Sequence, residues 1–257
     1  MLIALTREIS PAISHCQLTH QPRMPIDLAL ARAQHATYET CLEVAGCRVM
    51  RIAASDDLPD CVFIEDTAVV VPELAILTRP GAVSRRAEIS AVAEALRPQR
   101  TLAQVEPPGT MDGGDVLAAG RQVFVGVSSR TNPEGARQLR AIIAPYGYTV
   151  EEIEVRGCLH LKSAVTLVGD NLLLMNSAWL PENPFTFFDR IEVDPREPSA
   201  ANTVLAGGQL ICAAAYPRTN ERLQQRGLSV QAVDASELAK AEGALTCCSL
   251  IFESAST

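Results

Sequence analysis

Short apolar runs recur along the whole chain, and their lengths of four to eight residues are typical of buried β-strands. Two longer segments, 27–45 and 84–96, have apolar residues at spacings of three and four, which predicts helices. Two helix starts are predicted at Asn132-Pro133-Glu134 and at Asn220-Glu221, where an N-cap residue precedes an acid. The predicted strands are 2–6, 47–53, 61–64, 68–71, 74–78, 116–119, 123–127, 165–169, 172–176, 203–207, 209–216 and 249–253.

The order of these elements repeats along the chain. The tripeptide Arg-Thr-Asn occurs at 130–132 and again at 218–220, each time after an apolar strand and before a predicted helix. The two copies are 88 residues apart, which is twice 44. Polar residues that interrupt the strand-like runs recur in similar steps of 47, 48, 42 and 45. These residues are Glu65, Asp112, His160, Asn202 and Cys247.

A period of this size is typical of radial or solenoid arrays, in which each repeat is one small unit. Each unit here reads strand, turn, strand, helix, strand, and five units of about fifty residues account for the chain. We therefore predict an α/β fold of five ββαβ-type units closed into a ring, as one domain over 1–257, rather than a doubly wound sheet. Equivalent strand ends meet near the axis of a ring, so Glu65, Asp112, His160 and Cys247 should surround one channel.

The composition indicates a folded protein with an acidic surface. Hydrophobic residues make up 47% of the chain, which is enough for a sizeable core. The net charge of −8, with 22 basic and 30 acidic residues, argues against nucleic acid and anionic membranes as partners. Arg7 and Glu8 lie where a signal peptide would be apolar, and the uncharged stretch 198–217 predicts strand-turn-strand rather than a membrane span. We expect a soluble cytoplasmic protein.

Eight cysteines are irregularly spaced along the chain, and none forms a CxxC pair. A structural zinc site is therefore not predicted, and a reducing compartment argues against a disulfide framework. Most of these cysteines are expected to be small buried hydrophobic residues.

Several polar segments suit ligand binding, although each also has a purely structural interpretation. Glu65 and Asp66 lie inside an apolar run, where they could form a water-exposed strand edge or bind a cation such as a guanidinium. The sequence Asp-Gly-Gly-Asp at 112–115 could be a tight turn, or it could let the backbone approach a ligand closely. His160 beside apolar residues could be structural, but its position in the repeat favours a role in a site, with Lys162 on the same strand face.

Two arginines and two cysteines add further candidates. Arg85 and Arg130 lie near predicted helix starts, where they could bind a carboxylate or remain solvated. Cys247 occupies the repeat position, and Cys248 should point to the opposite face if the segment is extended. Adjacent cysteines rarely form a mutual disulfide without strain, so one cysteine is predicted in the site and the other in the core.

Taken together, six blocks of this sequence resemble the dimethylarginine dimethylaminohydrolase family of the guanidine-modifying, or pentein, superfamily. They occur in the family's order over residues 60–250, and they read FIEDTAVV, TRPGAVSRR, MDGGDVL, SSRTN, HLKS and EGALTCCS. The family fold is a five-bladed α/β propeller of ββαβ units, so the resemblance implies the architecture that the repeat predicts.

The resemblance also implies roles for individual residues. Cys247 is the expected nucleophile, His160 the general acid and base, and Asp112 the residue that orients His160. The segment 14–27 resembles the family's mobile lid, though it matches only loosely. The expected substrate ligands are Glu65 and Asp66 for the guanidinium, Arg85 and Arg130 for the α-carboxylate, and Asp60, the Leu18 carbonyl and the backbone around Ala241 and Glu242 for the amino acid head.

The implied reaction is hydrolysis of Nω,Nω-dimethyl-L-arginine, or the monomethyl form, to L-citrulline and the methylated amine. It proceeds through a covalent S-alkylthiouronium intermediate and needs no metal or organic cofactor, although a cysteine-histidine pair could bind an inhibitory zinc ion. Two alternatives stay open. One is an arginine deiminase-like hydrolase of another guanidino or amidino substrate, and the other is a non-catalytic pentein binding factor. A homodimer is one possible assembly.

Overall fold

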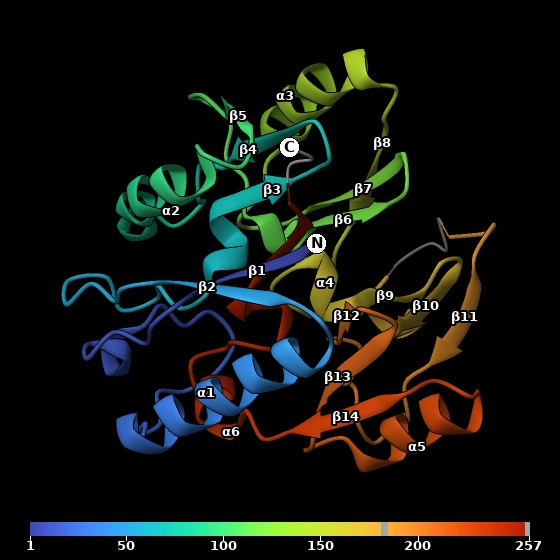
Figure 1. Cartoon of the computed structure of the whole chain (residues 1–257). Coiled ribbons are helices and arrows are strands. Elements are labelled where there is room, and N and C mark those ends of the chain that lie inside the picture. The colour runs from blue at the N-terminus through green and yellow to red at the C-terminus, as the bar shows by residue number, and fades with distance from the viewer. Residues whose placement is uncertain (181–184, 255–257) are drawn as a thin grey trace.

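Five three-stranded sheets make up most of the molecule, and Figure 1 shows the longer helices at its periphery. The structure is a computed structural model, and it describes residues 1–180 and 185–254. In four sheets, two antiparallel strands are followed by a helical connection to a third strand, which pairs parallel with the second. In the remaining sheet the last strand of the chain takes the first position and pairs antiparallel with the first strand. The predicted ββαβ-type unit is therefore confirmed.

The sheets and their strands are as follows. The first contains β15 (Leu250–Glu253), β1 (Leu2–Arg7) and β2 (Arg48–Ile52), and the second contains β3 (Ala68–Val70), β4 (Leu74–Leu77) and β5 (Thr101–Gln104). The third contains β6 (Val116–Ala119), β7 (Gln122–Val127) and β8 (Thr149–Glu154), and the fourth contains β9 (Val165–Gly169), β10 (Leu172–Met175) and β11 (Asp189–Glu192). The fifth contains β12 (Val204–Ala206), β13 (Gln209–Ala213) and β14 (Val230–Val233).

Five hydrophobic clusters join neighbouring sheets and close the ring. Successive side chains of a strand point to opposite faces, so each middle strand can supply two clusters. Phe124 of β7, for example, packs with the fourth sheet, whereas the next residue, Val125, packs with the second. Residues that share a cluster across the five junctions include Leu5 and Leu77, Val69 and Val125, Phe124 and Leu173, Leu174 and Leu210, and Ala4 and Ile211. The predicted closed ring of five units is therefore confirmed.

The strands β5, β8, β11 and β14 were not predicted from the sequence, because they lie at the outer edge of their sheets. Most of their side chains are at least partly exposed, and β8 buries only Ile153 while β11 buries only Ile191. A strand with so few buried positions has no apolar run. The predicted strand 61–64 is wrong, since this segment forms a turn and the start of a 3-10 helix.

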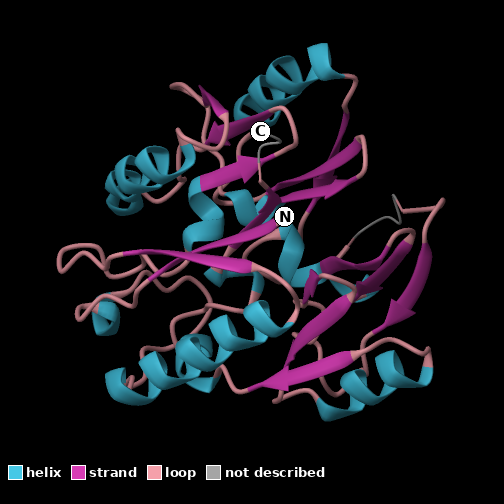
Figure 2. Ribbon diagram, viewed as in Figure 1, coloured by secondary structure: helices cyan, strands magenta, loops and turns pink. Residues whose placement is uncertain are grey.

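The longer helices surround the sheets, as Figure 2 shows, and most follow the predicted pattern. α1 (Leu28–Val44) and the pair η3 (Val83–Glu88) and α2 (Ile89–Leu96) confirm the two segments with helical spacing. α3 (Pro133–Ile143) begins as predicted, with the Asn132 side chain accepting a hydrogen bond from the Gly135 N–H. The remaining helices are α4 (Leu161–Ala164), α5 (Pro217–Gln225), α6 (Ser236–Ala239), η1 (Ile13–His15), η2 (Ile64–Thr67), η4 (Gly113–Asp115), η5 (Ala144–Tyr146), η6 (Ser177–Trp179) and η7 (Thr246–Cys248).

The predicted helix start at Asn220 is wrong. α5 begins at Pro217, and Tyr216 occupies its N-cap position. A proline at the first helical position has its φ angle fixed in the helical range, so it starts the helix earlier. The second Arg-Thr-Asn therefore lies inside the first turn, where the Asn220 amide donates to the Ala213 carbonyl instead of capping the helix.

The uncharged stretch 198–217 contains β12 and β13, joined by a turn in which Gly207 and Gly208 have positive φ angles. The predicted strand-turn-strand is confirmed. Across the residues that the structure describes, no helix is both long enough and apolar enough to cross a membrane.

Candidate active site

Short helical turns precede the first strands of four sheets, and four of the repeat's polar residues lie within these turns or at their N-cap positions. η2 precedes β3, η4 precedes β6, α4 precedes β9, and η7 precedes β15. η2 contacts both η4 and η7, and α4 contacts η4, so these turns meet at the centre of the ring. The structure thereby brings together Glu65, Asp112, His160 and Cys247, as the repeat predicted.

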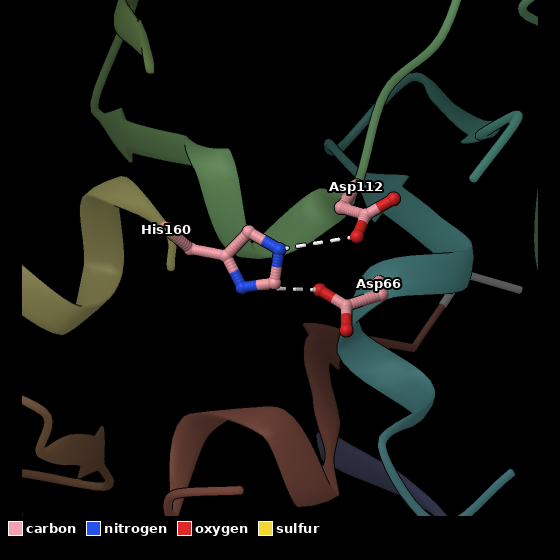
Figure 3. A group of neighbouring side chains, drawn as sticks. All are labelled: Asp66, Asp112 and His160. Atoms are coloured by element: carbon pink, nitrogen blue, oxygen red, sulfur yellow. Dashed lines mark hydrogen bonds and ion pairs between the residues drawn. The ribbon is translucent and has the colours of Figure 1, made fainter. Parts of the chain in front are cut away.

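His160 lies beside two carboxylates, which approach the same side of its ring in Figure 3. Its Nε2 is 3.1 Å from Oδ2 of Asp112, and its Nδ1 is 3.9 Å from Oδ1 of Asp66. All three side chains are buried, and their ligand atoms lie within 4.8 Å of one another. Desolvation lowers the pKa of His160, but Asp66, Asp115 and Asp112 outweigh it and raise that pKa to about 9. The imidazole is therefore protonated at neutral pH.

The two glycines of Asp-Gly-Gly-Asp are needed for close approach, not only for a turn. A Cβ on Gly114 would lie 2.7 Å from Nδ1 of His160 and 2.8 Å from Oδ1 of Asp66. A Cβ on Gly113 would lie 2.1 Å from the Glu65 carbonyl oxygen. The Gly114 N–H also donates to Oδ1 of Asp66 at 3.1 Å. Because real Cβ contacts are not this short, any side chain here would push the histidine and its acid apart.

Asp66 is an ionised, buried carboxylate. The Arg85 guanidinium donates to its Oδ2 from Nη1 at 2.6 Å and also binds both carboxylate oxygens of Glu88. Burial alone would raise the pKa of Asp66, but His160 and Arg85 hold it at about 2. The same two acids, Glu88 and Asp66, raise the pKa of Arg85 against the effect of its own desolvation. Asp66 thus carries a full negative charge in the site.

Cys247 borders the same cleft as Asp66, His160, Arg85 and Arg130. Burial, followed by the charges of Glu65 and Asp66, raises the pKa of its thiol to about 12. The neighbouring Cys248 is fully buried in the cluster between the first and fifth sheets. The two cysteines therefore face different surroundings, as predicted, although the segment is the 3-10 turn η7 and not an extended strand; the role of Cys247 in a site stays a prediction.

Glu65 points away from this cleft. Its carboxylate accepts from Nζ of Lys162 at 2.5 Å and from the Thr246 hydroxyl at 2.7 Å. These three residues border a cavity of about 270 Å³ that is surrounded by the first strands of all five sheets. Asn202, the remaining repeat residue, bonds to Thr246 at the same end. Glu65 and Asp66 therefore face opposite ends of the central channel.

The other end of the cleft holds the residues expected to bind an amino acid head. Asp60 is buried, and both of its carboxylate oxygens accept from the Gln17 N–H at 3.1 Å. Nη2 of Arg130 donates to the Thr19 hydroxyl at 2.9 Å, and its Nη1 lies 3.7 Å from Oδ2 of Asp112. Ala241 borders this cleft directly, while the half-buried Leu18 packs against the adjacent hydrophobic cluster.

Asp115, which the sequence does not single out as a site residue, supports the backbone next to His160. Its Oδ1 accepts from the Leu161 N–H, next to His160, and its Oδ2 accepts from the Ser128 hydroxyl. Burial raises the pKa of Asp115 to about 6. The second acid of Asp-Gly-Gly-Asp was the available signal. Glu88 forms an ion pair with Arg85. The only feature of the sequence that could have indicated this pair is their spacing of three residues, which puts them on the same face of a helical turn.

The chain is closely similar to proteins of known name and structure. A curated dimethylarginine dimethylaminohydrolase from Streptomyces coelicolor is 40% identical over 248 residues, which cover 96% of this chain and 95% of that protein. The structure of a cysteine-to-serine variant of the Pseudomonas aeruginosa enzyme complexed with citrulline matches with a TM-score of 0.93 and 33% identity, covering 97% and 98% of the two chains. A histidine-to-glycine variant of a dimethylarginine dimethylaminohydrolase, as an adduct with S-methyl-L-thiocitrulline, matches with a TM-score of 0.92 and 32% identity over 98% and 100%. No protein-family model matches the chain.

Proposed function

Because this chain belongs to the dimethylarginine dimethylaminohydrolase family, we propose that it hydrolyses Nω,Nω-dimethyl-L-arginine and Nω-monomethyl-L-arginine to L-citrulline and the methylated amine. The observation that carries the proposal is the protonated His160 held beside Asp112 and Asp66 in the cleft that Cys247 borders. A nucleophilic thiol, a proton donor and a fixed anion are what displacement of an amine from a guanidinium carbon requires.

The resting thiol of Cys247 is neutral, because its pKa of about 12 is far above physiological pH. A guanidinium bound to Asp66 adds a positive charge beside the sulfur and lowers this pKa, so substrate binding favours loss of the thiol proton to solvent. The thiolate then attacks the guanidinium carbon, forming the C–S bond of a neutral tetrahedral intermediate. The nucleophile is therefore activated only when its substrate is present.

His160 supplies the proton for the leaving group. Protonated His160 donates to the dimethylamino nitrogen, the C–N bond breaks, and dimethylamine leaves as a neutral amine. A covalent, cationic S-alkylthiouronium and a neutral imidazole remain. Neutral His160 then takes a proton from water as the oxygen bonds to the same carbon. The C–S bond breaks with its electron pair going to the Cys247 sulfur, and the new hydroxyl group loses its proton to solvent as neutral citrulline is released. Asp112, bonded to Nε2, keeps Nδ1 directed toward the reacting atoms through both steps.

At the head of the substrate, Arg85 and Arg130 take the α-carboxylate, and Asp60 takes the α-ammonium group. Nη1 of Arg85 makes one hydrogen bond, to Asp66, among the described residues, so a second N–H on that nitrogen is available. The Leu18 carbonyl and the backbone at Ala241 complete the ammonium site. Glu65 was also predicted to bind the guanidinium, and this stays a prediction, since its carboxylate here bonds Lys162 and Thr246.

A substrate panel tests the proposal. Purified protein is incubated with asymmetric dimethylarginine, monomethylarginine, arginine and agmatine, and citrulline or its analogue is measured with the released amine. We expect both methylated arginines to be turned over, and agmatine, which has no α-carboxylate, to be turned over poorly. Turnover of arginine with none of the methylated forms would replace the proposal by an arginine deiminase-like activity, and no turnover at all would favour the binding factor.

We also propose a cytoplasmic location, supported by eight cysteines that are all free thiols. A homodimer is part of the same proposal, and light scattering on the purified protein tests it.

A further inference from the structure

The segment 17–21, called the lid segment below, borders the cleft through Gln17 and forms neither a helix nor a strand. It is held by the Gln17 N–H on Asp60 and by the Thr19 hydroxyl on Arg130. Both anchors are residues to which the proposed function assigns the head of the substrate. A bound substrate would compete for Asp60 and Arg130, so these two contacts cannot by themselves keep the segment closed over it.

A third anchor is the side chain of Glu242, a residue that also borders the cleft but whose carboxylate has no assigned substrate partner. One carboxylate oxygen of Glu242 accepts from the Thr19 N–H at 2.8 Å, and the other accepts from the N–H groups of His20 and Gln21 at 2.5 and 2.6 Å. Three successive backbone N–H groups directed at one carboxylate form an anion-binding nest. Glu242 belongs to the far end of the chain, 223 residues from Thr19. It therefore joins the lid segment to the backbone that leads to Cys247.

The backbone at Glu242 supports a specific role for this side chain. Its φ angle is +56°, and Glu242 is the one non-glycine residue with a positive φ in the described part of the chain. It follows α6, where its N–H bonds the Ala239 carbonyl and the Gly243 N–H bonds the Leu238 carbonyl, as at a helix C-terminus. Glycine is the usual residue in this left-handed conformation, because any side chain is strained there. A glutamate here makes the folded protein less stable than a glycine would, and ending the helix does not require a glutamate. The side chain of Glu242 is therefore expected to have another role.

The lid segment must also open. The space remaining in the cleft is about 20 Å³, which is about the room needed for one water molecule. Dimethylarginine is many times larger, so it cannot enter or fit without movement of the lid segment or the cleft side chains. The contacts of the lid segment therefore determine how easily the cleft opens and how firmly it closes.

We propose that Glu242 is a positioning residue that fastens the lid segment over the bound substrate through the backbone N–H groups of residues 19–21. This inference rests on the proposed function for the identity of the substrate, but not for the contact itself. When the substrate occupies Asp60 and Arg130, Glu242 keeps the segment in place and holds the Leu18 carbonyl at the ammonium site. Its loss should weaken substrate binding much more than it slows the chemical steps.

Two variants separate this role from a purely structural one. Glu242→Gly removes the carboxylate and relieves the backbone strain, so the folded protein should be at least as stable as the wild type in thermal unfolding. Glu242→Gln keeps the length of the side chain but replaces one acceptor oxygen by an NH2 group that cannot accept. Glu221→Gln, on the exposed face of α5, is the matched control for loss of one acidic charge.

The first measurement is amide hydrogen exchange of residues 19–21 in the substrate-free protein. We expect exchange at least about tenfold faster in Glu242→Gly, an intermediate increase in Glu242→Gln and none in Glu221→Gln, since an unprotected N–H exchanges whenever the segment opens. Unchanged exchange at these three amides in Glu242→Gly would overturn the proposal. The exchange result does not depend on turnover, so it stands or fails separately from the substrate panel.

The second measurement is the kinetics of the substrate found by the panel. In Glu242→Gly we expect KM to rise about tenfold and kcat to change less than threefold, because the lost contact acts on binding and not on Cys247 or His160. A fall in kcat with an unchanged KM would contradict the assignment and would place Glu242 in the chemical steps.

Discussion

Two adjacent acids of η2, Glu65 and Asp66, face opposite ends of the central channel, and their pKa values are shifted in opposite directions. Asp66 faces the cleft, where His160 and Arg85 overcome its desolvation and hold its pKa at about 2. Glu65 faces the cavity between the first strands, and its burial raises its pKa although Lys162 and Thr246 offset part of that effect. The difference comes from the number of positive partners, since both carboxylates are buried.

The next pair of neighbours, in η7, shows the same division. Cys247 borders the cleft, whereas Cys248 packs into the core with its thiol directed at the Ala244 carbonyl. In both turns one residue borders the cleft and its neighbour faces the inner cavity or the core. Side-chain type alone therefore does not separate the two roles, and variants at neighbouring positions test the division directly.

The largest difference is expected between the two cysteines. Cys247→Ser should lower kcat by at least about 10⁵-fold, because a serine hydroxyl without a lowered pKa is a poor nucleophile for a guanidinium carbon. Cys248→Ser should keep most of the activity and lose about 1–2 kcal/mol of unfolding free energy, because it puts a hydroxyl into an apolar cluster. Steady-state kinetics and urea unfolding measure both effects. Equal loss of activity in the two variants would remove Cys247 from its assigned role.

Substitutions of the two acids, Asp66 and Glu65, should differ nearly as much in their effect on activity. Asp66→Asn should lower kcat/KM by about 10⁴-fold, since it removes the anion that binds the guanidinium and supports protonated His160. Glu65→Gln should leave activity within about tenfold of the wild type but cost about 2 kcal/mol of stability, because Lys162 loses its buried anionic partner. If Glu65→Gln instead matches Asp66→Asn in kcat/KM, both acids bind the guanidinium.

A glycine tests the spacing of the site. Gly114→Ala should lower kcat by about 10³-fold, because the added methyl group displaces both His160 and Asp66 from their positions. Gly169→Ala is the control, since a Cβ there meets only Leu172 Cβ at 3.4 Å, which is ordinary contact. Full activity in Gly114→Ala would mean that the site does not depend on this close approach.

The smallest effect concerns pH and stability. The folded-state pKa of His160, about 9, is above the unfolded value near 6.5, so its stabilising contribution is complete below pH 6.5 and is lost as pH rises through 9. Between pH 6.5 and 8 this corresponds to about 2 kcal/mol of unfolding free energy, at about 1.4 kcal/mol per pH unit. Urea unfolding at several pH values should show this slope in the wild type and a nearly flat profile in His160→Gln. An equal slope in both proteins would assign the titration to another group.

Much of the fold could be predicted because its inner strands are buried on both faces. Runs such as VFVGV in β7 supply two hydrophobic clusters at once, and burial on both sides leaves a continuous apolar signal. The outer strands have no such signal. In β8, the sequence TVEEIE buries one side chain, so its pairing depends on β7 and not on its own pattern. The predicted start of α5 is wrong for a local reason. Pro217 starts the helix before the second Arg-Thr-Asn, whereas the first Arg-Thr-Asn precedes its helix.

The sequence by itself determined the repeat, the approximate positions of its five polar residues and the separation of Cys247 at the cleft from Cys248 in the core. Only the tertiary structure decided which way each residue faces. A 3-10 turn advances about 120° per residue, so the side chains of neighbouring residues in η2 and η7 point in different directions. Which of the two reaches the cleft depends on how the turn packs between its two neighbouring sheets. The contact of Glu242 with the lid segment is of the same kind. It joins residues more than 200 positions apart through backbone N–H groups, and no side-chain pattern records those groups.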